Sequence, residues 1–200
     1  MAQQPDEVYG KSKSGGDFLP HSEGVTAFLC VDVVDMGSRI EQFGDAPKKE
    51  KEKVRLVFAS GERHENGELV LVSKEMTNSM FKDANLRKFL EAWRGKPYTQ
   101  EQADAGPPLH KLQGQVALLT IAHEVSKKKG NKYAAIMSVS PLPKGMATVE
   151  PDVLDEYVRP DFITDLKATY AADVRAFRAE SGVSDDEPPL DPSQADDLPF

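Results

Sequence analysis

The chain has 200 residues and a formal net charge of −8, with 39% hydrophobic and 29% charged residues. These values allow one domain with appendages or two small domains, built around a modest rather than a large core. A single cysteine, Cys30, excludes an intramolecular disulfide and a cysteine-based metal cluster, and a polar N-terminus with only short apolar runs excludes a signal peptide and a membrane span.

The N-terminal half is predicted to contain a flexible arm and three strands. Residues 1–22 are rich in Gly, Ser, Lys and Pro without periodicity, which predicts the arm. A β-branched apolar run predicts a strand over 25–34, and alternation predicts a second over 53–59 with its basic residues outward. The Asn-Gly turn signal at 66–67 favours a hairpin into a third strand over 68–77.

A helix is predicted over residues 82–94. Leu86, Phe89, Leu90 and Trp93 recur at helical spacing and mark one apolar stripe. We expect Asp83 in the first turn, where the helix dipole favours an acid, and Gly95 as the C-cap.

Two further strands complete the expected domain. Apolar, β-rich runs predict strands over 115–125 and 132–139, joined by a basic turn over 126–131. Three strands, a helix and two strands are the order of the OB fold, a five-stranded barrel with its helix between strands three and four. We therefore expect a mainly β protein whose OB domain occupies residues 23–146.

The C-terminal quarter is predicted to be helical and then acidic. Residues 147–180 form a helical extension, in which 161–180 carries a second apolar stripe: Phe162, Leu166, Tyr170, Val174 and Phe177. We favour packing of this stripe on the barrel, with a homodimer as the alternative. Residues 181–200 have too little apolar content to offset their ordering entropy, which predicts a disordered acidic tail.

Charge is distributed unevenly along the chain. Residues 147–200 hold fourteen acidic and four basic residues and carry −10, so residues 1–146 carry +2. The acidic total therefore does not exclude a nucleic-acid partner for the first segment.

The strongest local signal is the C-terminal tip, Asp196-Asp197-Leu198-Pro199-Phe200. Apolar residues at the end of a polar tail favour docking: the Phe200 ring suits an apolar pocket, its carboxylate an arginine, and the two aspartates basic rim residues. The tip resembles that of bacterial single-stranded DNA-binding proteins, which also ends in acids, Leu or Ile, Pro and Phe.

A second resemblance covers roughly residues 16–146. The segments KDANLRKFLEAWRGKP at 82–97, KLQGQ at 111–115 and LPKGM at 142–146 are similar to segments of small phage and prophage replication proteins. The resemblances imply an OB fold and a phage-type protein that coats single-stranded DNA in replication, recombination or repair. They also imply the cytoplasm of a bacterial host, and recruitment of polymerase, helicase or nuclease subunits by the tip.

Binding of single strands without sequence choice needs cations for phosphates and rings for bases. The basic turn and the second and third strands supply such residues, and the candidates are Lys53, Arg55, Lys74, Lys127, Lys128, Lys129, Lys132 and Tyr133. Phe58 is a further candidate ring, although its strand face favours the core, and Phe43 and Phe81 are reserves.

Other chemistry has little support in the sequence. The four histidines are scattered without metal-ligand spacing, and we find no phosphate-binding loop and no set of nucleophile, base and orienting group. We predict no metal, no cofactor and no enzymatic activity. Three alternatives stay open: a protein-binding adaptor, an annealing accessory, and a metal-dependent nuclease built on Asp32 and Asp35.

Overall fold

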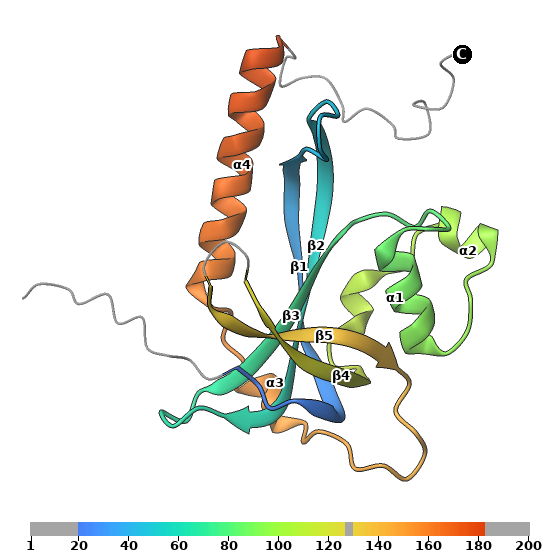
Figure 1. Cartoon of the computed structure of the whole chain (residues 1–200). Coiled ribbons are helices and arrows are strands. Elements are labelled where there is room, and N and C mark those ends of the chain that lie inside the picture. The colour runs from blue at the N-terminus through green and yellow to red at the C-terminus, as the bar shows by residue number, and fades with distance from the viewer. Residues whose placement is uncertain (1–19, 127–129, 183–200) are drawn as a thin grey trace, which may run out of the picture.

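The computed structural model describes residues 20–126 and 130–182. One antiparallel sheet has the strand order β3-β2-β1-β4-β5 (Figure 1). Its strands are β1 Gly24–Glu41, β2 Lys49–Arg63, β3 Leu69–Thr77, β4 Val116–Val125 and β5 Lys132–Ser140. The helices of the described residues are α1 Asn85–Arg94, α2 Gln100–Asp104, α3 Asp152–Asp155 and α4 Asp161–Ser181, with a 3-10 turn at Leu109–Leu112.

The mainly β class is confirmed, as is the order of three strands, a helix and two strands. The first two strands are longer than predicted, and beyond the body of the sheet they form a projecting hairpin (Figure 1). We expected the first strand to end at residue 34. Instead Gly37 adopts a φ of 71° beside a β-bulge, and pairing continues as far as Glu41 with Lys49.

Strand β1 is shared by the two halves of the sheet. Residues 24–29 pair with β4, and residues 29–41 pair with β2. A register shift between Cys30 and Asp32 marks the point where the strand changes partner. The sheet curls so that its outer strands approach, and the Lys74 ammonium donates a 2.9 Å hydrogen bond from β3 to the Ile136 carbonyl of β5.

The first core lies between the sheet and α1. The predicted stripe of α1 is confirmed, because Leu86, Phe89, Leu90 and Trp93 are all buried there. The Trp93 indole also donates to the Val116 carbonyl at 2.9 Å, which ties α1 to β4. Gly95 is confirmed as the left-handed C-cap, but the helix begins at Asn85, so the expectation that Asp83 lies in its first turn is wrong.

A second core lies on the opposite face of the sheet. The β1 side chains that point away from the first core form a buried apolar row: Ala27, Leu29, Val31, Val34 and Met36. Val153 of α3 and Ile163 and Tyr170 of α4 cover this row, so the prediction that the C-terminal helix packs on its own sheet is confirmed. The predicted stripe is out of phase at its start, because Ile163 is 1% exposed while Phe162 is 56% exposed.

Candidate nucleic-acid interface

Lys53 and Arg55, the two residues of β2 predicted to bind DNA, are covered rather than exposed. Lys53 is 6% exposed, and its ammonium lies 2.7 Å from the Glu41 carboxylate and 2.9 Å from Thr77 Oγ1. The predicted outward orientation of Lys53 is therefore wrong. Helix α4 packs on the apolar row of β1 and covers this face of the sheet. Lys53 and Arg55 of β2 lie on the same face and are therefore covered, and they are paired with acids.

Arg55 belongs to the same covered face. Its guanidinium lies 2.8 Å from the Glu75 carboxylate and 3.2 Å from Ser73 Oγ. Glu75 also accepts a 2.9 Å hydrogen bond from the Tyr170 hydroxyl of α4. Arg55 is thus neutralised in a network beneath α4. An interface that binds DNA through exposed cations must therefore be formed by other residues.

The remaining residues predicted to bind DNA fall into three groups: one that bridges strands, two that are exposed, and three that lie outside the described residues. Lys74 is half-buried and bridges the outer strands, as described above. Lys132 and Tyr133 are exposed at the start of β5, and the Tyr133 hydroxyl donates a 2.6 Å hydrogen bond to Glu124. Three further cations, Lys127, Lys128 and Lys129, lie outside the described residues, as does the tip 196–200.

Outside α4, the exposed aromatic rings of the described residues are the two reserves and Tyr133. Phe58 is fully buried, with its ring centroid 5.5 Å from that of Trp93, so its placement in the core is confirmed. Phe43 is 68% exposed and Phe81 is 59% exposed. Both rings lie in polar connections, where no apolar neighbours follow at strand or helix spacing. This pattern in the sequence could have predicted that the two rings are exposed.

The projecting hairpin holds cations that the sequence reasoning missed. Lys48 and Lys49 are exposed, and the Lys51 ammonium lies 5.2 Å from the centroid of the Phe43 ring. The neighbouring Glu50 is bound by an arginine of α4 at 2.8 Å, which offsets its charge. The cluster Lys48-Lys49-Glu50-Lys51 is visible in the sequence, but it precedes the strand predicted over 53–59 and was not among the candidate residues.

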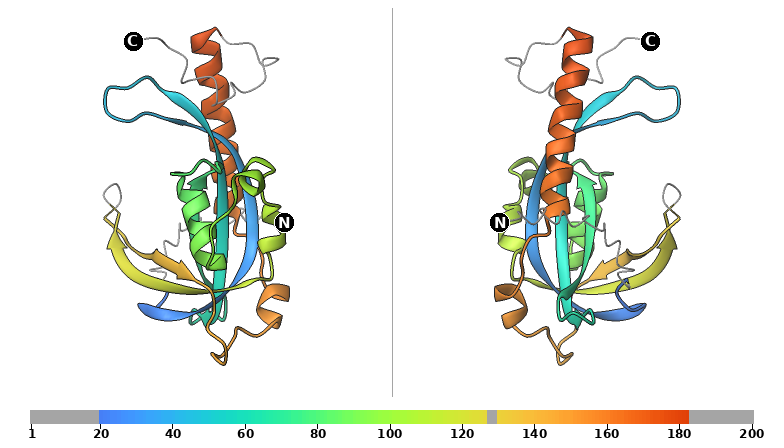
Figure 2. Two further views of the ribbon diagram at one scale, coloured as in Figure 1. Left: turned by 90° about the vertical axis from the view of Figure 1, so that its right-hand side faces the viewer. Right: turned by 90° about the vertical axis from the view of Figure 1, so that its left-hand side faces the viewer.

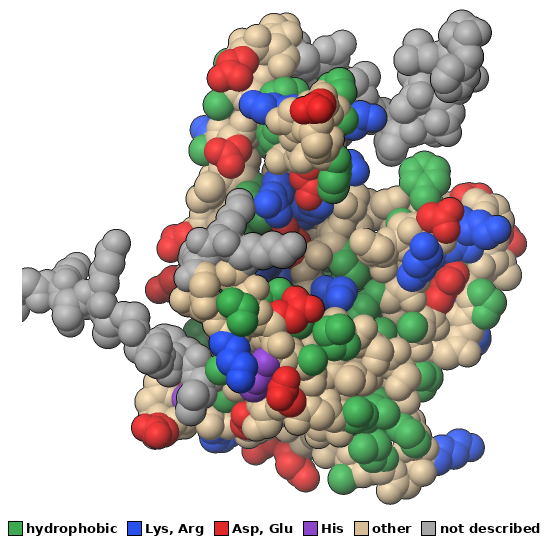
Figure 3. All heavy atoms as spheres, viewed as in Figure 1, with side chains coloured by type: hydrophobic (Ala, Val, Ile, Leu, Met, Phe, Trp, Pro, Cys, Tyr) green, Lys and Arg blue, Asp and Glu red, His purple; other side chains and the backbone are tan. Residues whose placement is uncertain are grey.

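The projecting elements share one side of the molecule. The tip of the β1–β2 hairpin and the β4–β5 end both project to the left in the left-hand view of Figure 2. Figure 3 looks onto this side and shows a hollow below the hairpin, with Lys and Arg side chains around it and the α1–α2 region to its right. Rings and cations are thus carried on arms around a concave surface.

Asp32, one of the two acids of the nuclease alternative, serves to attach the C-terminal extension. Arg159 donates two hydrogen bonds to its carboxylate, at 2.7 and 2.9 Å, and the Tyr157 hydroxyl donates a third at 2.8 Å. Asp35 instead accepts from the Gly37 backbone amide. In the described residues no group of three or more His, Cys, Asp or Glu side chains is placed to hold a metal ion.

The Asp32 contacts predict a dependence of stability on pH. Burial raises the pKa of Asp32, but the hydrogen bonds from Arg159 and Tyr157 outweigh it and hold the pKa below its ordinary value. A lowered carboxyl pKa stabilises the fold above the unfolded-state pKa, and this stabilisation is lost as pH falls through the folded-state pKa. We expect the free energy of unfolding, measured by urea titration, to fall as pH drops below about 4.

The matched variants are Asp32→Asn and Arg159→Gln. Each should lower stability at pH 7 by about 1–2 kcal/mol, because a buried polar group loses a partner while the half-exposed Arg159 is screened by water. Each should also lose less stability than the wild-type protein between pH 6 and pH 3.5. Wild-type and Asp32→Asn curves that stay parallel over this range would contradict the assignment.

A serine and a histidine meet at the edge of the sheet without forming a relay. The His21 Nε2 atom lies 2.7 Å from Ser60 Oγ and 3.3 Å from a Glu62 carboxylate oxygen. Both groups therefore approach the same ring nitrogen, whereas a nucleophile and its orienting acid must contact opposite nitrogens. The Glu62 amide also donates to Ser60 Oγ, and the cluster joins the start of β1 to β2.

Comparison with protein-family models, with curated proteins and with solved structures found no match for this chain. Within the described residues, no helix has the length and apolar character needed to cross a bilayer.

Proposed function

We propose that the chain is a single-stranded DNA-binding protein with an OB barrel, and that DNA lies in the hollow beside the two projecting hairpins. The barrel is supported by the strand order, by α1 between the third and fourth strands, and by the approach of β3 to β5. The observation that carries the function is the presence of an exposed ring and lysines on both arms: Phe43 in contact with Lys51 on one, and Tyr133 next in the chain to Lys132 on the other.

The two arms suit single-stranded DNA that is bound through its phosphate backbone and through the faces of its bases. Lysine ammonium groups neutralise phosphates, while Phe43 and Tyr133 offer stacking faces to any base. Because no arrangement within residues 20–126 and 130–182 points to hydrogen-bond readout of base edges, we expect binding without sequence choice. In a phage-type setting the protein would coat exposed strands in replication, recombination or repair, and its tip would recruit polymerase, helicase or nuclease subunits.

The direct test is fluorescence anisotropy with labelled oligo-dT at low and moderate salt. We expect a complex whose affinity falls steeply with salt, because phosphate contacts release counterions. The buried Trp93 is a poor reporter, since its indole is already bound in the core. No complex at low ionic strength would overturn the proposal, and partner binding that persisted without DNA binding would instead support a protein-binding adaptor.

Variants on the arms test the location of the site. Tyr133→Ala and Phe43→Ala should each weaken binding by about 1–3 kcal/mol, the usual contribution of one stacked base. The triple variant Lys48→Gln, Lys49→Gln and Lys51→Gln should lower the slope of log affinity against log salt by about 2–3. Lys167→Gln on the exposed side of α4 is the control and should leave both quantities unchanged. If the control weakens binding as much as the arm variants, the placement of DNA in the hollow is wrong.

A further inference from the structure

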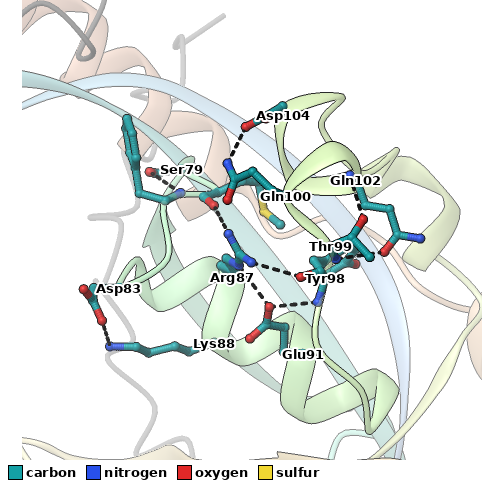
Figure 4. A network of polar contacts seen from close by, with 12 residues as sticks. Ser79, Asp83, Arg87, Lys88, Glu91, Tyr98, Thr99, Gln100, Gln102 and Asp104 are labelled. Carbon is teal, nitrogen blue, oxygen red and sulfur yellow. Dashed lines mark hydrogen bonds and ion pairs between the residues drawn. The ribbon is translucent and has the colours of Figure 1, made fainter.

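The region between β3 and β4 forms a rigid lobe, built from residues 79–104 and including α1 and α2 (Figure 4). At its centre the Arg87 side chain is 7% exposed. Its guanidinium donates to Glu91 at 2.9 Å, to the Met80 carbonyl at 3.2 Å and to the Tyr98 carbonyl at 3.1 Å. One buried cation thus joins the loop before α1 to the loop after it.

Further polar contacts fix the same two loops. Glu91 also accepts a 2.9 Å hydrogen bond from the Tyr98 amide, and Thr99 and Gln102 form a reciprocal capping box at the start of α2. On the other side, the Ala84 amide donates to the Phe81 carbonyl at 2.9 Å. Burial of a guanidinium is costly unless its donors are satisfied, so this network holds both loops in one conformation.

The held loops present rings and cations to solvent. Phe81, in the loop before α1, is one of the most exposed large apolar side chains of the described residues. At the end of α1, the half-buried Arg94 guanidinium lies 4.2 Å from the centroid of the Tyr98 ring, which packs against the first core from the loop after the helix. Lys82 and Lys96 are exposed beside these two features.

The lobe carries a small positive net charge. Residues 79–104 contain five basic and four acidic side chains, and the acids Glu101 and Asp104 are exposed on α2. The other two acids face lysine or arginine: Asp83 lies 3.4 Å from Lys88, and Glu91 is bound by Arg87. The lobe borders the hollow on the right in Figure 3, where blue and red side chains lie together.

We propose that this lobe is a second binding site for single-stranded DNA, which takes the nucleotides that leave the hollow. Phe81 stacks on one base, the Arg94–Tyr98 pair offers a second stacking face, and Lys82 and Lys96 contact the phosphates. Arg87 acts as a positioning residue, because it touches neither base nor phosphate and fixes the loops that do. This inference rests on the proposed function and extends its site beyond the barrel.

The test compares oligo-dT of about 8 nucleotides with oligo-dT of about 30, because one OB fold covers roughly 4–16 nucleotides. The full-length protein should bind the longer oligonucleotide more tightly. Phe81→Ala and Arg94→Lys should each reduce affinity for the longer strand by roughly 5- to 100-fold, the range expected for one lost stack. Affinity for the short strand should change less than about 2-fold, given that the hollow is untouched.

Charge variants separate phosphate contact from stacking. The double variant Lys82→Gln and Lys96→Gln should reduce the salt slope by about 2 for the longer strand only. Lys111→Gln, an exposed lysine outside the lobe, is the matched control and should leave the slope unchanged. Arg87→Met should reproduce the loss for the longer strand while affinity for the short strand is kept, a pattern that general loss of folding would not produce.

The outcomes distinguish the two proposals. If Phe81→Ala, Arg94→Lys and the double lysine variant bind both lengths as the wild-type protein does, the lobe is not a DNA site, while the function of the hollow stands. If the wild-type protein binds neither length at low salt, the proposed function fails and the lobe site fails with it. If the lobe variants weaken both lengths equally, the lobe is part of the first site rather than a second one.

Discussion

Ile163→Asp is expected to unfold or aggregate the protein, whereas Phe162→Asp is expected to leave it folded. Ile163 is 1% exposed in the second core, and Phe162, its neighbour in the first turn of α4, is 56% exposed. A carboxylate placed in that core loses its hydration and gains no partner in exchange. The substitution should therefore lower the free energy of unfolding by at least about 3 kcal/mol. That is a large share of a typical stability of about 5–15 kcal/mol.

Urea titration and thermal melting of the two variants provide the measurement. Phe162→Asp should lie within about 0.5 kcal/mol of the wild-type protein, as expected for an exposed position. The pair is well matched because the same substitution is made on adjacent residues of the same helix. Equal stability of the two variants would show that α4 does not depend on the second core.

The same core bears on where the folding unit ends. We placed the OB domain at 23–146 and a helical extension at 147–180, but Val149, Val153 and Ile163 bury the apolar row of β1. A fragment of residues 20–146 would expose that row, whereas a fragment of residues 20–182 keeps it covered. The boundary predicted at residue 146 therefore separates the strands from the C-terminal helices, but it does not separate two folding units. We expect the two parts to fold as one unit.

Much of the fold was readable because its patterns are local. Alternation, β-branched runs and the Asn-Gly turn located the five strands, and the 3.6-residue period located α1 and α4. Strand ends were less predictable. Gly37 reads as a strand breaker in sequence, yet a bulge uses its positive φ to continue the hairpin that carries the lysine cluster.

The burial of Lys53 and Arg55 was not predictable from alternation alone. Alternation assigns residues to two faces of a strand, but it does not say whether a distant helix covers the second face. The unbroken apolar run of the first strand did hold this information, since a strand apolar on both faces is typical of burial on both sides. Combining that run with the stripe at 161–180 would have moved the predicted DNA contacts away from β2.

Deletion of residues 183–200 is expected to raise affinity for oligo-dT and to abolish recruitment of partner proteins. These residues contain six acidic side chains and no basic ones, so deletion changes the formal net charge from −8 to −2. We expect the acidic segment to compete at low salt with phosphates for the lysines around the hollow. The gain in affinity should shrink as salt rises, because screening weakens the competition over distances beyond about 10 Å at 0.1 M.

Two full-length variants separate competition from recruitment. Leu198→Ser with Phe200→Ser keeps every acid, so it should bind oligo-dT as the wild-type protein does but lose capture by purified polymerase, helicase or nuclease subunits. Replacement of the acids at 185, 186, 187 and 191 by Asn or Gln keeps the tip, so it should raise DNA affinity and retain capture. Unchanged DNA affinity after deletion at low salt would contradict the competition, and capture retained by the tip variant would contradict the role of Leu198 and Phe200.

The point where the tail begins makes competition within one chain physically reasonable. Helix α4 ends at Ser181, and Arg178 in its last turn is bound bidentately to Glu50, at 2.8 and 3.1 Å, in the hairpin beside Lys49 and Lys51. A segment that starts next to its competing cations has an effective concentration of millimolar order through its short tether. We therefore expect that single-stranded DNA has to exceed that local competition to bind, and that the displaced tail is available to partners only on protein that is already on DNA.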